Sequence, residues 1–150
     1  MKTTSRLEQA IKKLYIAFHS DKLHPECCMQ CAVGNILDNK DSWKHLADHH
    51  GTTKLNYVGK VHQNLGRKFN GYSPLELLQI EAIFLKACGY KLPLHYRNTK
   101  PENPTDKNVQ FNGLCAVIVY LCELDGINNI MDYSKLFEFE NNKPKYQLAI

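Results

Sequence analysis

The segment between Ser73 and Gly89 most constrains the fold, because its residues mark both ends of an α-helix. Ser73 and Glu76 have the spacing of a capping box, in which each side chain bonds the backbone N–H of the other residue. Pro74 occupies the first helical position, where the N–H that proline lacks would have no helical partner. Apolar residues then recur at helical spacing until Gly89, a residue that favours helix ends. The segment therefore predicts a long helix whose apolar side other elements must cover.

The same spacing of apolar residues predicts helices along most of the chain. The expected ranges are 4–19, Cys27 to Asn39, Asp41 to Gly51, Asn56 to Leu65 and Asp106 to Leu124. A linker with three prolines, from Lys91 to Pro104, crosses the surface without dividing the chain into domains. Turn residues at 141–144 predict a small C-terminal β-hairpin. We predict an all-α fold, a compact bundle of five to seven helices forming one domain over residues 1–150.

Composition narrows the classes of function and location. The net charge of +4 is mild, and core aromatics next to a solvated helix face explain the cations and aromatics between Tyr57 and Tyr72, so nucleic acid is not an expected partner. The first residues lead into Lys12 and Lys13 without the apolar core of a signal peptide. The longest apolar run, Leu114 to Cys122, is too short to span a bilayer. We therefore expect a soluble cytoplasmic protein without a membrane partner.

Three of the six cysteines, Cys27, Cys28 and Cys31, lie within five positions. In a reducing cytoplasm such a cluster favours thiols or metal ligands over a disulfide framework. Cys28 and Cys31 have the Cys-x-x-Cys spacing that lets two thiolates bind one tetrahedral ion. If a helix begins here, its dipole also lowers the pKa of Cys27 or Cys28 and makes the thiolate reactive. The other cysteines, at positions 88, 115 and 122, lie in apolar segments and are expected to pack in the core.

Histidines supply the nitrogen ligands that a metal site here would need. By helical spacing, His50 falls on the side of Trp43 and Leu46, so it is predicted to face inward. A core-edge histidine bonded to a carbonyl oxygen is the alternative interpretation. His24 and His49 are alternates for the same role, as Cys27 is for the thiolates.

Glu81 lies in the middle of the apolar stripe of the helix that begins after Ser73. A buried carboxylate without a partner is costly, so Glu81 is expected to bond a cation, a hydrogen-bond network or a metal. A structural ion pair with Arg67 or Lys68 is one expectation. The other is a metal ligand, or an acceptor that orients the histidine. The predicted metal set is thus Cys28, Cys31, His50 and Glu81, holding zinc or iron.

Short stretches also resemble a known family. Cys31-Ala32-Val33-Gly34-Asn35, Asp48-His49-His50-Gly51 and Gly71-Tyr72-Ser73-Pro74 resemble a family of small bacterial proteins that carry the name of the Na(+)-translocating NADH-quinone reductase. The resemblance implies an accessory role in electron transfer. It carries over no catalytic residue, because the Cys-x4-Cys-x2-Cys pattern of a plant-type ferredoxin is missing from the chain.

Three hypotheses of function follow from the sequence. The first is a small protein with a Cys/His metal-binding or reactive-thiol site. The second is a non-enzymatic helical module that binds a protein partner or a second copy of itself. The third is the electron-transfer accessory. No glycine-rich nucleotide fingerprint or catalytic triad is present, so we expect no nucleotide cofactor and assign no catalytic residue.

Overall fold

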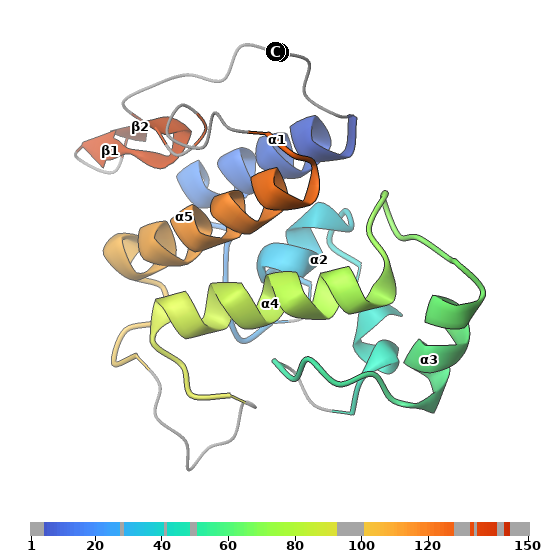
Figure 1. Ribbon diagram of the computed structural model, residues 1–150. Helices are drawn as coiled ribbons and strands as arrows, with labels where there is room; N and C mark the ends of the chain where they lie inside the picture. Colours follow the sequence, from blue (N-terminus) through green and yellow to red (C-terminus); the bar gives the residue numbers. More distant parts are fainter. Residues whose placement is uncertain are drawn as a thin grey trace.

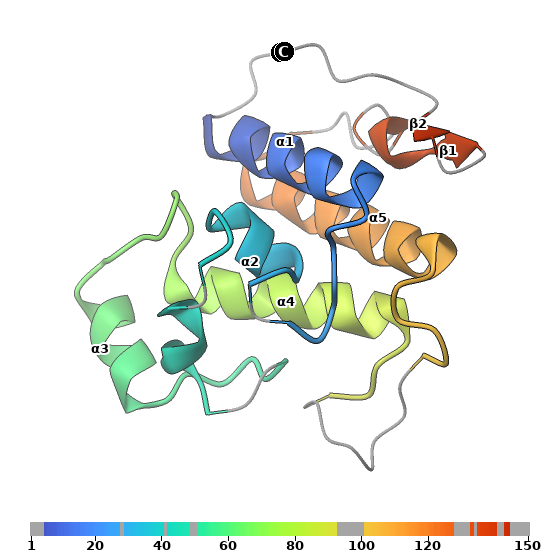
Figure 2. The same cartoon turned by 180° about the vertical axis from the view of Figure 1, so that it is seen from behind.

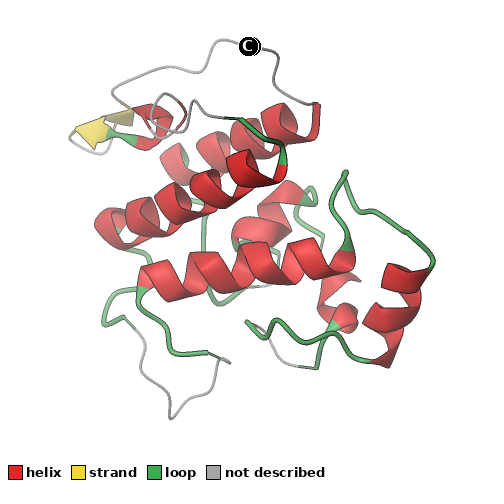
Figure 3. Ribbon diagram, in the orientation of Figure 1, coloured by secondary structure: helices red, strands yellow, loops and turns green. Residues whose placement is uncertain are grey.

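A computed structural model describes residues 5–27, 29–40, 42–48, 51–92, 101–127, 133, 135–140 and 143–144. In this part of the chain the elements are α-helices, two 3-10 helices (η) and two very short strands (Figure 3). Their bounds are α1 Ser5–His19, α2 Ala32–Ile36, η1 Ser42–Leu46, α3 Tyr57–Asn64, α4 Pro74–Cys88, α5 Lys107–Leu124, η2 Lys135–Phe137, β1 Phe139–Glu140 and β2 Lys143–Pro144. The predicted all-α fold is confirmed.

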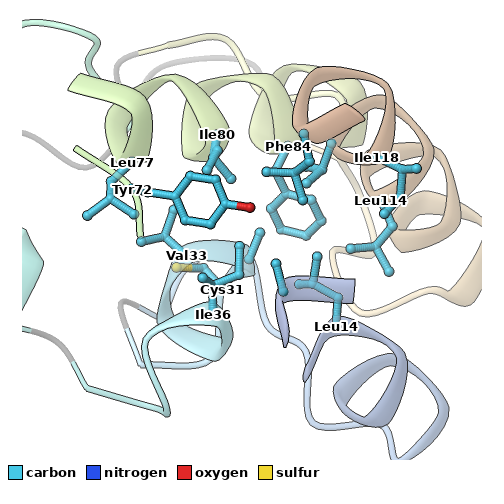
Figure 4. Close-up of a cluster of buried hydrophobic side chains, with 14 of the residues drawn as sticks. Leu14, Cys31, Val33, Ile36, Tyr72, Leu77, Ile80, Phe84, Leu114 and Ile118 are labelled. Atoms are coloured by element: carbon cyan, nitrogen blue, oxygen red, sulfur yellow. The ribbon is translucent and has the colours of Figure 1, made fainter. Parts of the chain in front are cut away.

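The three long helices, α1, α4 and α5, surround the core, and α2 lies between α1 and α4 (Figures 1 and 2). Helices α4 and α5 pack closely because Gly113 has no side chain, and a β-carbon there would lie 2.5 Å from Sγ of Cys88. Figure 4 shows the buried side chains converging between these helices. Those without measurable exposure include Leu14, Cys31, Val33, Tyr72, Leu77, Ile80, Phe84, Leu114 and Ile118.

Helix α4 has the predicted ends. The Ser73 side chain accepts from the N–H of Glu76 at 3.2 Å, and Glu76 Oε1 accepts from the N–H of Ser73 at 2.9 Å. Gly89 ends the helix with a φ of 106°, a left-handed conformation that suits glycine. Local sequence signals were sufficient here, because capping bonds join residues only three positions apart.

A network around Arg6 ties α1 to the ends of α4 and α5. Its guanidinium donates to Oδ1 of Asp125 at 2.5 and 2.7 Å and to the carbonyl oxygen of Gly71 at 2.8 Å. It also lies over the Tyr72 ring, 4.7 Å from the centroid. The Asp125 side chain is only 2% exposed, so Arg6 supplies the positive charge that a buried carboxylate needs.

Two of the predicted helices differ from the structure. The second begins at Ala32 with Cys31 as its N-cap, not near Cys27, because residues 24–31 form turns closed by their own backbone hydrogen bonds. The third is the single 3-10 helix Ser42–Leu46 and does not continue to Gly51. The predicted hairpin is present as β1 and β2, which pair antiparallel with Phe139 opposite Pro144. Within the described residues, no helix has the length and apolar character needed to cross a bilayer.

Candidate functional site

Cys31 and Glu81, two of the predicted metal ligands, meet at the first turn of α2. Cys31 is fully buried, and its Sγ accepts from the N–H of Gly34 at 3.3 Å. Glu81, on α4, is also fully buried, and its Oε1 accepts from the N–H of Val33 at 3.3 Å. The first turn of a helix has N–H groups without helical partners. Both side chains therefore stabilise the start of α2.

The predicted pair between Glu81 and Arg67 or Lys68 is wrong. Both cations are exposed, whereas Glu81 lies under α2 in the interior. Arg67 Nη1 instead donates to Nδ1 of His62 at 3.2 Å. Sequence proximity suggested this pair, but Gly71 and Ser73 turn the chain so that α4 carries Glu81 inward.

A second thiol lies near Glu81 on the same helix. Burial raises the pKa of Cys88 to about 12, and the negative charge of Glu81 adds to the effect. Tyr90 follows the end of α4, and its hydroxyl donates to Oε2 of Glu26 at 3.0 Å. Burial, together with this bond, raises the pKa of Tyr90 well above its ordinary value. These groups stay protonated at neutral pH, so Cys88 does not have the thiolate character of a reactive cysteine.

The remaining predicted ligands are not all described. Cys28, His49 and His50 lie outside the described residues. His24 Nδ1 accepts from the N–H of Glu26 at 3.2 Å, and Cys27 is half-buried in the turn before α2. Cys27 does not lie at a helix N-terminus, so the helix-dipole argument for its reactivity is wrong. Among the described side chains, no group of three or more His, Cys, Asp or Glu has metal-binding geometry.

The predicted packing role of the later cysteines is confirmed for two of them. Cys88 is 4% exposed and Cys122 is fully buried. Cys115 is half-buried on α5.

Helix α3 carries a different feature, an apolar stripe on its outer side. Tyr57, Val61 and Leu65 follow one another at one-turn spacing, and Val58 lies beside them. Their exposed fractions are 81%, 38%, 63% and 44% in that order. Gly59 is the buried residue of α3. We call Tyr57, Val58, Val61 and Leu65 the α3 face; it points away from the core.

The position of α3 is set by close contact with η1. A β-carbon on Gly59 would overlap the carbonyl oxygen of Leu46. The Asn56 side chain caps α3 by accepting from the N–H of Gly59 at 2.8 Å, and its Nδ2 donates to the carbonyl oxygen of His45 at 3.0 Å. The backbone N–H of Asn56 donates to the carbonyl oxygen of Leu46 as well, at 3.0 Å. These bonds hold the apolar stripe outward.

The same region carries the excess charge of the chain. Residues 51–75 contain four basic residues, Lys54, Lys60, Arg67 and Lys68, and no acidic residue. Removing these four from the 19 basic residues leaves 15, which equals the number of acidic residues. All four are exposed. Within the described part of the chain, none of them forms an ion pair with a carboxylate.

The sequence analysis missed this surface, although it predicted the helix. Apolar spacing shows that one side of a helix is apolar, but not whether that side faces the core. Two signals could have identified it: a glycine in the middle of the helix, and a run of 27 residues between Asp48 and Glu76 without an acidic residue.

Comparisons with known proteins give no match for the chain. No protein-family model matches it, and neither does any curated protein or solved structure. Its function is therefore inferred from its own residues.

Proposed function

We propose that this protein is a non-enzymatic helical interaction module that binds a partner protein through the α3 face. The observation that supports it is the exposure of Tyr57 and Leu65 on a helix that is clamped in place. Scattered exposed apolar residues are ordinary, but four on one side of a two-turn helix form a patch of the kind that marks interaction sites. Tyrosine is also enriched in protein interfaces.

The site that the sequence predicted fits this proposal. The described thiol and carboxylate at α2, Cys31 and Glu81, bond backbone N–H groups, which accounts for their burial without a reaction. The fold then serves to present α3, which lies on the opposite side of the molecule from the β1–β2 hairpin (Figures 1 and 2).

Affinity capture with matched variants tests the proposal. We expect a protein that co-purifies with the wild type to be lost with Leu65→Ser. It should be retained with Ile16→Ser, since Ile16 is an exposed apolar residue on α1, 47% exposed, and lies outside the α3 face. Circular dichroism and thermal melting of both variants show whether the fold is intact. An identical set of captured proteins for wild type and Leu65→Ser contradicts the proposal.

A second candidate function is metal binding at the start of α2. It is favoured by the approach of Cys31 and Glu81 to the same helical turn. With Cys28 and His50 they would give zinc or iron the thiolate, imidazole and carboxylate ligands those metals accept. A cytoplasmic location, which we propose with it, keeps the thiols reduced. Elemental analysis of anaerobically purified protein tests this candidate: about one metal per chain is expected, lost with Cys28→Ser and Cys31→Ser together.

A further inference from the structure

We infer that the α3 face binds an acidic amphipathic helix of the partner protein. This inference rests on the proposed function and adds the chemistry of the partner. Its basis is the combination of an exposed apolar stripe with cations that lack carboxylate partners in the described part of the chain.

The apolar part of the α3 face has the geometry of a helix–helix contact. Tyr57, Val61 and Leu65 lie on successive turns, so they form a ridge along the axis of α3. Eight residues give a helix about 12 Å long, which matches roughly two turns of a partner helix lying alongside it. A partner with apolar residues three and four positions apart would cover this ridge.

The charges around the ridge select the sign of the partner. Lys54 precedes α3, Lys60 lies within it, and Arg67 and Lys68 follow it, so cations flank both ends of the ridge. A helix carrying Glu or Asp beside its apolar stripe would bring carboxylates to these cations. Such complementarity speeds association and excludes basic partners.

A protein helix fits the α3 face better than a lipid surface does. Membrane binding by a surface helix scales with the apolar area it buries, and such helices carry Trp, Phe or Leu over several turns. The α3 face is short, and two of its four residues are valines. Tyr57 and Arg67 belong to the residue types that are enriched in protein interfaces.

Binding of two synthetic peptides to the full chain tests the inference. The first peptide is a fluorescein-labelled helix with a leucine stripe flanked by glutamates, and the second has glutamine in place of every glutamate. By fluorescence anisotropy, we expect the glutamate peptide to bind about tenfold more tightly at low salt, and the difference to shrink at high salt. Lys60→Gln with Lys68→Gln should weaken only the glutamate peptide, and Leu65→Ser should weaken both. Lys12→Gln, on α1, is the matched charge control and should change neither.

Several results would overturn the inference. These are equal affinity for the two peptides, binding unaffected by Leu65→Ser, and binding of the wild type to phosphatidylglycerol vesicles but not to the glutamate peptide. Dimerisation of the wild type that Leu65→Ser abolishes would assign the α3 face to a second copy and also overturn it. Where capture of a protein still depends on Leu65, failure with the peptides overturns the partner chemistry alone. Where capture is independent of Leu65, the proposed function fails as well.

Discussion

Gly59 and the carbonyl oxygen of Leu46 are in direct contact, with no room for a β-carbon between them. This contact places α3 against η1 by its glycine side and leaves its apolar side in solvent. The side chain of Asn56 adds the N-cap of α3 and a bond to the carbonyl oxygen of His45. One missing side chain thus determines which side of α3 a partner could reach.

Gly59→Ala should destabilise the protein by about 1–3 kcal/mol, because the new methyl group meets rigid backbone. Alanine favours a helix intrinsically, so a destabilisation would come from the clash alone. Urea unfolding measures the effect, with the exposed Lys60→Ala on the same helix as control, expected within about 0.5 kcal/mol of the wild type. A stabilised Gly59→Ala variant would show that α3 does not press on Leu46.

Arg6→Ala should cost about 3 kcal/mol, because it leaves the carboxylate of Asp125 buried without its cation. Arg6→Lys should restore only part of this, since an ammonium group cannot reproduce the forked bonds to Asp125 and Gly71. Chemical denaturation of the two variants gives both numbers. Equal stability of wild type and Arg6→Ala would mean that solvent reaches Asp125.

Glu81→Gln should destabilise the protein less than Glu81→Ala does. Glutamine keeps an oxygen that can accept from the N–H of Val33, whereas alanine leaves that N–H unsatisfied in the interior at a cost of about 1–3 kcal/mol. Hydrogen exchange of the α2 amides, with urea unfolding, measures both variants. If alanine proved no worse than glutamine, the carboxylate would not be holding the start of α2.

Stability should fall in alkaline solution. Burial raises the pKa of Cys88 from 9.0 to about 12, so the folded protein keeps a proton that the unfolded chain releases. This contribution is complete below pH 9 and is lost as the pH rises from 9 toward 12. Burial also raises the pKa values of Tyr72 and Tyr90, which act in the same direction.

Urea midpoints measured between pH 7 and pH 11 test the alkaline effect, and Cys88→Ala should flatten the decline. Alanine removes the proton that couples folding to pH at this position while leaving both tyrosines in place. A decline of the same slope in Cys88→Ala would show that the tyrosines account for the pH dependence by themselves.

Sequence and structure agree best where the contacts are local. The capping box at Ser73 and the helix end at Gly89 involve neighbours along the chain, and both were predicted correctly. The burial of Glu81 was predicted too, because a carboxylate inside an apolar stripe has to go where the stripe goes. Its bond to the N–H of Val33, 48 positions away, was not, since no local pattern indicates which element covers α4.

The sequence by itself determined the helical class, the ends of α4 and the apolar spacing of α3, because these depend on backbone preferences and on residues a few positions apart. Only the tertiary structure decided that Cys31 and Glu81 support the start of α2, and that the apolar side of α3 faces outward. The reason is physical: an apolar stripe must be covered by something, and whether another part of the chain covers it depends on how distant elements pack. For α3, the contact of Gly59 with Leu46 made that choice.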